Sequence, residues 1–357
     1  MNAPPRRYTG RGALSNPPGR FAAQQLSAVD DGWYTEGEPD SLLTTLEPER
    51  ARSLISTNDS PDVPFERSIN PYRGCSTGCC YCYARPSHAY MGLSPGLDFE
   101  TRLFYKADAA QLLVEELARP GYVCKPITLG ANTDPYQPVE RRMGVTRSIL
   151  QVLARTRHPV TVVTKSALVL RDMDLLSDMA HARLASVAVS VTTLDEELKR
   201  RMEPRAAAPR ARLRVLRELN AAGVPAGVLV APVIPALTDC ELEDILAAAA
   251  AAGARWAGYV LLRLPYEIKP LFTEWLAEHY PQRAAHVMSL IRDMRGGREN
   301  DPRFGFRMRG TGPYALLLRS RFKLACRRLG LGSGGRDELS TRDFRPPERG
   351  GQLRLGL

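Results

Sequence analysis

Short apolar runs alternate with amphipathic stretches through the middle of the chain. Six runs rich in Val, Ile and Leu are too short for helices and are fully apolar, as parallel strands buried on both faces are. We predict strands at residues 68–72, 126–131, 160–165, 186–192, 226–234 and 258–264. Between them the spacing predicts helices at residues 106–118, 144–157, 168–181, 209–222 and 238–252. Gly223 and Gly253 follow the last two, as expected where a left-handed residue ends a helix.

This alternation predicts an α/β fold with right-handed crossovers and a parallel sheet, either doubly wound or curled into a full or partial barrel. The chain divides into four parts. Residues 1–65 carry Pro, Gly and Arg without sustained periodicity and predict an extended, partly disordered N-terminal arm. Residues 66–265 form the alternating core. Residues 266–330 predict a helical, basic C-terminal extension, and residues 331–357 a flexible tail, with extension helices at residues 267–279, 281–292 and 312–329.

Composition narrows the class of protein. The chain has 357 residues, of which 44% are hydrophobic and 25% charged, and this excludes a wholly disordered, collagenous or disulfide-stapled protein. No run approaches the ~20 apolar residues that span a bilayer. The first ten residues are rich in Pro and Arg and have no apolar signal region. We therefore expect a cytoplasmic protein without a membrane segment.

The formal net charge of +10 is unevenly placed. From residue 291 to the end there are 16 Lys and Arg against 7 Asp and Glu, so a balance of +9 lies in the last 67 residues. Two interpretations stay open for this region: a solvated surface, or a face that binds a polyanion. Only six of the 49 basic residues are Lys, a bias that weakens an argument from basicity alone.

The seven cysteines are the strongest chemical signal. Four of them, Cys75, Cys79, Cys80 and Cys82, lie within eight residues, whereas a disulfide framework would spread them along the chain. The spacing CxxxCxxC of Cys75, Cys79 and Cys82 suits three irons of a cubane iron–sulfur cluster and leaves the fourth iron without a protein ligand. Two glycines, at positions 74 and 78, give such a loop its backbone freedom.

Two other metal sites remain as alternatives. A structural zinc ion would need four sulfurs from eight residues, although the adjacent Cys79 and Cys80 tend to point apart. We therefore interpret Cys80 as a bystander. An electron-transferring cluster would need a fourth cysteine from elsewhere in the chain, which leaves Cys124, Cys240 and Cys326.

With Tyr81 before the last cysteine, and with its place after the first predicted strand, this loop resembles that of the radical S-adenosylmethionine (SAM) superfamily. Residues 70–86, together with residues 133–138, resemble the spore photoproduct lyase-like, or DNA repair photolyase-like, subgroup, and the likeness extends over residues 67–265. The resemblance implies a partial (β/α)6 TIM-like barrel with its site at the carboxyl ends of the strands. It also implies a lyase-like enzyme in which a 4Fe-4S cluster cleaves SAM reductively to a 5′-deoxyadenosyl radical. An electron donor such as flavodoxin or ferredoxin would reduce the cluster.

The resemblance also suggests which residues contact SAM. These lie beside the cysteines or at strand ends: Tyr81, Asn132, Thr133, Asp134, Lys165, Ser190, Thr192 and Arg205. Four of them have a structural alternative: Asp134 as a turn cap, Lys165 as a rim residue with its charge in solvent, Ser190 as a polar core residue and Arg205 as a surface residue. No catalytic residue is assigned.

The substrate is less constrained. Spore photoproduct lyases return a hydrogen atom through a cysteine near the end of the second strand, but residues 130–134 contain no thiol and Cys124 lies at the other end of that strand. Phe304, Phe306 and Tyr314 are interleaved with arginines, as in surfaces that bind phosphates and exposed bases. Nucleic acid is thus one expected partner. The alternatives are modification of a protein or small metabolite, and a non-enzymatic iron–sulfur or metal-binding protein.

Overall fold

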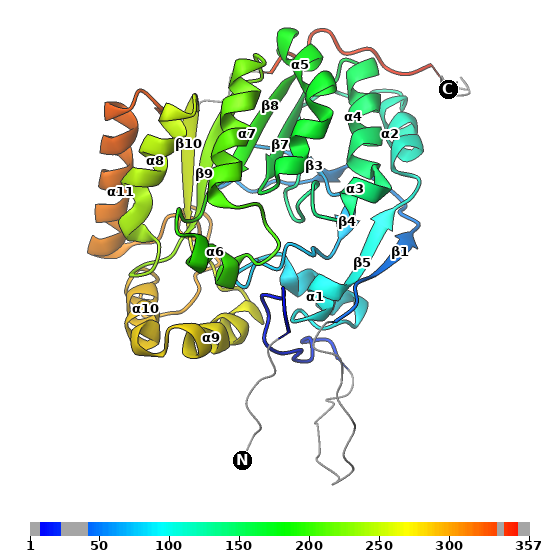
Figure 1. Cartoon of the computed structure of the whole chain (residues 1–357). Coiled ribbons are helices and arrows are strands. Elements are labelled where there is room, and N and C mark those ends of the chain that lie inside the picture. Colours follow the sequence, from blue (N-terminus) through cyan, green and yellow to red (C-terminus); the bar gives the residue numbers. More distant parts are fainter. Residues whose placement is uncertain (1–7, 23–41, 334–338, 349–357) are drawn as a thin grey trace.

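A curved parallel sheet forms the centre of the computed structural model, which describes residues 8–22, 42–333 and 339–348 (Figure 1). Its strand order is β11-β10-β9-β8-β7-β6-β3-β2, and only the pair β2–β3 is antiparallel. The strands are β2 (Ser56–Thr57), β3 (Arg67–Ile69), β6 (Ile127–Leu129), β7 (Val160–Thr164), β8 (Ala185–Ser190), β9 (Ala226–Val233), β10 (Trp256–Leu261) and β11 (Gly332–Ser333). From β3 to β10 each strand lies beside the one before it in this sheet, which confirms the α/β class and the parallel sheet.

Helices connect successive strands and pack against the sheet and one another (Figure 1). The connecting helices are α2 (Ala109–Leu117), α3 (Glu140–Met143), α4 (Val145–Arg155), α5 (Met173–His181), α6 (Glu196–Met202), α7 (Pro209–Ala221) and α8 (Leu242–Ala251). Short 3-10 helices precede α5 and α8, namely η2 (Ala167–Asp172) and η3 (Asp239–Glu241). After β10 come α9 (Ile268–His279), α10 (Pro281–Asp293) and α11 (Gly312–Arg328), the last of which packs on α8.

A second, smaller sheet lies beside α1 (Asp98–Thr101) and a 3-10 helix, η1 (Arg85–Met91) (Figure 1). It has the order β1-β5-β4, with β1 (Thr45–Glu49) parallel to β5 (Arg102–Lys106) and β4 (Tyr72–Arg73) antiparallel to it. This sheet stands where the chain leaves β3 and enters the cysteine-containing loop. It therefore supports that loop from one side.

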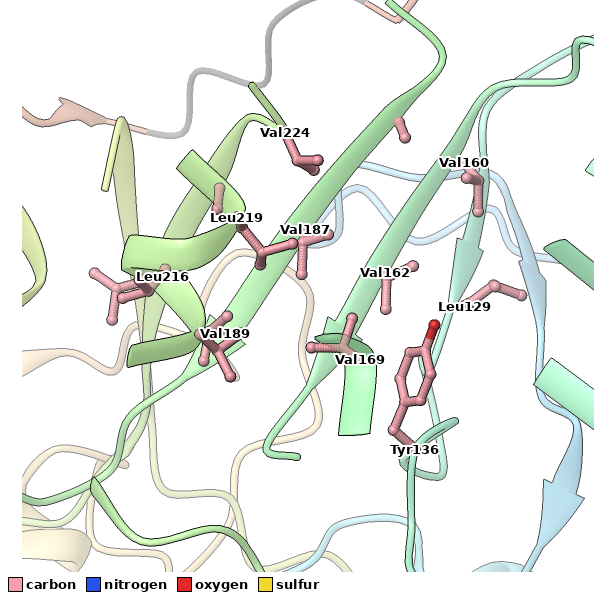
Figure 2. Close-up of a cluster of buried hydrophobic side chains, with 14 of the residues drawn as sticks. Leu129, Tyr136, Val160, Val162, Val169, Val187, Val189, Leu216, Leu219 and Val224 are labelled. Atoms are coloured by element: carbon pink, nitrogen blue, oxygen red, sulfur yellow. The ribbon is translucent and has the colours of Figure 1, made fainter. Parts of the chain in front are cut away.

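The main core lies between the sheet and its helices. Figure 2 shows Leu216 and Leu219 of α7 facing Val187 and Val189 of β8. All four side chains are completely buried, and β8 is buried on both faces. Each such side chain contributes about 1.5–3 kcal/mol by leaving water. This burial is why an uninterrupted apolar run forms a central strand.

A second apolar cluster lies beyond the carboxyl ends of the strands. It brings α9 and α10 together with the cysteine-containing loop, and Trp275 and Phe272 of α9 stack with ring centroids 5.8 Å apart. Cys80 and Tyr81 belong to this cluster. The helices after residue 265 thus form the support on which the loop rests.

Most predicted elements are present, although several boundaries differ. The strand predicted at residues 258–264 lies two to three residues earlier, at Trp256–Leu261, and α1, α3, α6, β1, β2 and β5 were not predicted. The predicted strand at residues 68–72 is divided into β3 and β4, because Asn70 and Pro71 break the pairing. The helix predicted at residues 106–118 begins only at Ala109, since Arg102–Lys106 forms β5 between β1 and β4. The helices predicted beyond residue 265 correspond to α9, α10 and α11.

The structure differs from expectation at both ends of the chain. Residues 42–65, expected to be an irregular arm, contain β1 and β2, and Arg11 to Leu14 are buried. Residues 331–333, expected in a flexible tail, contain β11. Farther on, backbone amides of Ser340 and Arg345 donate to the carbonyls of Arg183 and Thr156, both at 2.8 Å. Such contacts involve backbone atoms and leave no periodic pattern in the sequence. The rest of the two predicted terminal segments lies outside the described residues.

No helix in the described ranges has the length and apolar character needed to cross a bilayer.

His158, which precedes β7, contacts the C-terminal segment, residues 339–348, through Phe344. Its ring lies edge-on to Phe344 at 5.3 Å, its Nε2 accepts from the Tyr122 hydroxyl at 2.9 Å, and its Nδ1 faces the Pro159 carbonyl at 3.0 Å. Burial lowers the pKa of His158 to about 4, with a smaller contribution from the charge of Arg67. The side chain is therefore neutral in the folded protein at pH 7.

We predict that this histidine makes the protein sensitive to mild acid. Between pH 6.5 and 4 the unfolded chain binds a proton at His158 and the folded chain does not, so stability falls as the pH falls. The contribution to the free energy of unfolding is up to about 3 kcal/mol. Urea unfolding gives the free energy of unfolding at pH 7 and at pH 4.5. The decrease between the two pH values should be smaller for His158→Gln than for the wild type. An equal loss in both would refute the prediction.

Candidate active site

The cysteine-containing loop, residues 74–84, lies between β4 and η1 and has no regular secondary structure. Gly74 and Gly78 adopt φ values of 74° and 75°, which favour glycine. A Cβ on Gly74 would also lie 2.7 Å from a methyl carbon of Leu103. Backbone hydrogen bonds hold the loop from outside: the amide of Cys75 donates to Phe99 and that of Cys80 to Met202, at 2.9 and 3.0 Å.

Three of the loop's four cysteines lie near enough to one another for their charges to interact. Burial raises the pKa values of Cys75, Cys79 and Cys82, that of Cys75 to about 12, and nearby thiolates of this set add to the rise in Cys75 and Cys79. Cys80 instead packs into the apolar cluster with α9 and α10. Three sulfurs that lie together and unpaired by disulfides are a suitable donor set for an iron–sulfur cluster.

The same geometry disfavours a single zinc ion. In the described part of the chain, no three His, Cys, Asp or Glu side chains are grouped closely enough to bind one metal ion. Zinc needs sulfurs about 2.3 Å from one centre, whereas each iron of a cubane cluster binds its own thiolate. The set of Cys75, Cys79 and Cys82 therefore fits the cluster better than it fits zinc.

A buried ion pair joins the loop to the N-terminal segment 8–22. Arg85 donates to the carboxylate of Glu100, and both side chains are completely inaccessible to solvent. The same carboxylate accepts from the backbone amides of Gly12 and Ala13 at 3.0 and 2.9 Å. Gly12 meets the loop so closely that a Cβ on it would lie 1.7 Å from the carbonyl oxygen of Gly78. In Figure 1 this dark blue segment passes between α1 and α6.

A second buried carboxylate holds the other side of the loop. Glu203, just after α6, accepts from the hydroxyls of Tyr81 and Thr192 and pairs with Arg212 of α7. Burial alone would raise the pKa of Glu203, but the charges of Arg212 and Lys165 lower it to about 2. The carboxylate is ionised and orients Tyr81 beside the cysteines.

A pocket of about 310 Å³ opens next to the loop. Asp134, Lys165 and Arg205, three of the predicted SAM contacts, line it together with Thr77, whose hydroxyl lies 3.1 Å from the sulfur of Cys75. The charge of Lys165 reaches Cys79 and Cys82, so the pocket adjoins these cysteines. Arg141 adds another cation to its lining.

Asp134 also braces the strand ends. Its carboxylate accepts from the Thr164 hydroxyl at 2.7 Å and from the Lys165 amide at 2.8 Å, and it caps the turn at Tyr136 at 2.9 Å. The amino group of Lys165 lies 3.4 Å from the carbonyl of Ala231. These contacts orient Lys165 along the rim of the sheet.

The other predicted contacts do not line this pocket. Asn132 binds through its backbone to the Asn70 side chain at 2.8 Å, and the Thr133 hydroxyl donates to the Tyr72 carbonyl at 3.0 Å. Ser190 is buried at the end of β8, and Thr192 bonds to Glu203 at 2.8 Å. Their roles toward SAM stay predictions.

Sequence reasoning missed the groups that hold the loop: Arg85, Glu100, Gln137, Glu203 and Arg212. Gln137 accepts from the Ser76 amide at 2.9 Å and donates to the Gly74 carbonyl at 3.2 Å. Of these five residues, Arg85 lies nearest to the cysteine motif in the sequence, three residues after Cys82. The others have no local signature, because their partners lie far along the chain.

The family of the chain follows from comparison with known proteins. The model of the radical SAM superfamily matches residues 69–249. An uncharacterised protein of Mycobacterium tuberculosis is 39% identical over 242 residues, which cover 67% of this chain and 71% of the relative. An uncharacterised protein of Methanocaldococcus jannaschii is 29% identical over 196 residues, 54% of this chain and 69% of the relative. The chain therefore belongs to the radical SAM superfamily and is an enzyme of that class, whose cofactors are a 4Fe-4S cluster and SAM.

Solved structures share its fold. Spore photoproduct lyase in complex with dinucleoside spore photoproduct superposes with a TM-score of 0.57 at 17% identity, over 81% of this chain and 82% of that one. A doubly substituted form with bound AdoMet and dinucleoside spore photoproduct gives a TM-score of 0.58 at 16% identity, over 81% of each chain. At such identities the likeness establishes the fold, a TIM-like radical SAM fold.

We predict that Gly12→Ala detaches the N-terminal segment from the loop. The added methyl group cannot fit against Gly78, and overpacking of this kind costs about 1–3 kcal/mol. Limited proteolysis should cut residues 8–22 roughly ten times faster, and less iron should be retained after reconstitution. Gly332→Ala is the control, because its nearest neighbours would be 3.5 and 3.7 Å away. Equal cleavage of both variants would contradict the prediction.

Glu203→Gln should destabilise the protein before any cofactor binds. It leaves the Arg212 guanidinium buried without a counter-charge, a loss of about 3–5 kcal/mol in the free energy of unfolding. Urea unfolding of the cofactor-free protein measures it. Glu197→Gln, which removes an exposed partner of Arg201, should cost less than about 1 kcal/mol. The prediction fails if the two variants lose similar stability.

Proposed function

We propose that this radical SAM enzyme uses Cys75, Cys79 and Cys82 to hold a 4Fe-4S cluster beside a pocket that binds SAM. Once bound, the two cofactors supply reductive cleavage of SAM and a 5′-deoxyadenosyl radical that abstracts a hydrogen atom from the substrate. The observation that carries the proposal is the proximity of three unpaired thiols, of which Cys75 is buried and Cys79 and Cys82 are partly exposed, to a cationic pocket. The pocket has a volume of about 310 Å³, which lies at the small end of the range for ligand pockets and suits part of a SAM molecule.

Different lining residues of the pocket are proposed to bind different groups of SAM. Lys165 and Arg205 offer cations for its carboxylate, and Asp134 offers an acceptor near Lys165 for its ammonium group. Cys75 and Tyr81 are each 7% exposed, so this part of the loop is shielded from water, as radical chemistry requires. Ser190 ends β8 and Thr192 lies two residues beyond it, and both hydroxyls are proposed to contact the carboxylate or the ribose of SAM.

The curvature of the sheet supports a partial (β/α)6 barrel. The hydroxyl of Tyr83 donates to the carbonyl of Ala131, just after β6, while its ring lies 5.6 Å from the guanidinium carbon of Arg263, just after β10. β6 and β10 are separated by three strands, each about 4.8 Å wide. Contacts from one tyrosine to residues that follow both strands are in keeping with a sheet that curves toward a barrel.

The proposed substrate is a nucleic acid. Phe304 and Phe306 are 52% and 43% exposed, and each ring lies under a guanidinium, from Arg307 at 4.5 Å and Arg303 at 4.9 Å. Exposed rings with arginines beside them suit unstacked bases and phosphates. Two of the solved spore photoproduct lyase structures contain dinucleoside spore photoproduct. Because the fold is shared, we propose the same class of substrate for this chain. A cytoplasmic flavodoxin or ferredoxin is the proposed electron donor.

The four cysteines test the cofactor assignment within one loop. We expect anaerobic reconstitution to give about four iron and four sulfide per chain, and dithionite to convert SAM into 5′-deoxyadenosine. Replacing Cys75, Cys79 or Cys82 with Ala should abolish both. Cys80→Ala should retain both, because Cys80 packs with α9 and α10 instead. A wild-type protein that binds no iron and cleaves no SAM would overturn the proposal, as would an equal loss in all four variants.

A further inference from the structure

Arg263 stands at the carboxyl end of the sheet, just after β10 and above the cysteine-containing loop. Its guanidinium carbon lies 5.6 Å from the centre of the Tyr83 ring, and Tyr83 directly follows Cys82. The Tyr83 side chain is 48% exposed. Arg263 therefore lies beside the cysteines on a side of the site that remains open to solvent, and it does not line the pocket that holds Lys165.

This arginine has an incomplete set of partners. Its Nε is buried and makes no hydrogen bond, and the guanidinium forms no ion pair with any residue in the described ranges. The hydrogen bond found for it runs from Nη1 to the sulfur of Met308, a weak acceptor, at 3.8 Å. A buried donor without a partner costs about 1–3 kcal/mol, and more when it carries a charge. The molecule maintains this arginine at a cost to its stability.

The neighbouring arginines are committed to other partners. Arg295 donates to the carbonyls of Leu262, Phe306 and Arg307 at 2.8–2.9 Å. Arg307 pairs with Asp62 at 2.6 Å. Arg263 alone of these three has no strong acceptor in the described structure.

The local field is positive. Burial lowers the pKa of Arg263, and the charge of Arg307 lowers it further, while Tyr83 and Asp62 oppose the shift. The pKa of Arg295 falls to about 10, through burial and the charge of Arg263, with Asp301 opposing. Asp62 and Asp301 are already bonded to Arg307 and Arg303. An entering anion would relieve the repulsion between guanidiniums and supply the missing acceptor.

We propose that Arg263 binds a phosphate group of the substrate next to Tyr83 and thereby positions the substrate over the cysteine-containing loop. The inference rests on the proposed function and deepens it, since it assigns one substrate contact to one side chain. The guanidinium fork matches two phosphate oxygens, and Nε and Nη2 are its free donors. The exposed rings of Phe304 and Phe306 belong to the loop that contains Met308 and Arg307, so they are placed for the adjoining bases.

Inorganic phosphate is the first probe, because it needs no cofactor and no assumption about the substrate. Calorimetric titration should show phosphate binding to the wild type, weakened roughly ten- to hundred-fold in Arg263→Gln. Arg263→Lys, which retains the charge but not the fork, should recover only part of the affinity. Arg319→Gln removes the same charge from the exposed face of α11 and should bind phosphate as the wild type does. Equal affinity in Arg263→Gln and the wild type would overturn the proposal, and so would equal weakening in Arg319→Gln.

A single-stranded trinucleotide tests whether the anion belongs to a nucleic acid. We expect the wild type to bind the phosphodiester form better than its uncharged methylphosphonate analogue, and Arg263→Gln to lose most of that difference. The melting temperature of Arg263→Gln should not fall below that of the wild type, because the substitution removes the buried, unpaired Nε. The yield of 5′-deoxyadenosine without substrate should be unchanged, since Arg263 contacts neither the cysteines nor the pocket in the described structure. If the protein cleaves no SAM but phosphate binding still depends on Arg263, the proposed function fails and the anion site stands. If SAM is cleaved and Arg263→Gln binds phosphate and trinucleotide normally, the anion site fails alone.

Discussion

Two buried carboxylates, Glu100 and Glu203, hold the cysteine-containing loop from opposite sides, and the site depends on them. The loop has no ladder of backbone hydrogen bonds to define its shape, so side chains from distant segments must do so. Each carboxylate is completely buried, is neutralised by one arginine, and still accepts from other groups. A buried charge that loses its partner costs several kcal/mol in the free energy of unfolding. Breaking either carboxylate–arginine pair would therefore destabilise the folded protein strongly. The protein therefore shapes the loop before any cofactor is bound.

The two anchors also explain why segments outside the parallel sheet matter. Glu100 fastens residues 8–22 over the loop, where Gly12 is the residue small enough for the contact with Gly78. Glu203 connects Tyr81 to the end of the sheet and to α7. Beneath them, α9 and α10 supply the apolar surface on which Cys80 packs. The N-terminal segment and the C-terminal helices are thus parts of the site's scaffold.

An element can be predicted from the sequence when its own residues specify it, and it is missed when it forms only by pairing with a distant segment. β7, β8 and β9 were predicted within two residues, because burial on both faces requires an uninterrupted apolar run. β1 and β5 were missed, since β1 reads TLEPE, is largely exposed, and becomes a strand only by pairing with β5. In the site the cysteines were found from their spacing, whereas Glu203 meets Tyr81 only in the folded chain. Asp134 combines the two alternatives considered for it, because it caps a turn and also lines the pocket.

The positions of charged residues in the sequence also do not show where an anion would bind. The sequence places most of the net charge after residue 291, yet Arg303, Arg307 and Arg321 of that region are each paired with a carboxylate. The charge of a paired guanidinium is partly offset by its carboxylate, so a count of arginines does not locate an anion site. The free donor belongs to Arg263, which lies in the core of the fold and outside the basic region. Arg11 and Arg67 also have a buried nitrogen without a partner, but Arg263 combines one with a position next to Tyr83 of the cysteine-containing loop. Such a nitrogen can be recognised only when every possible partner has been placed around it.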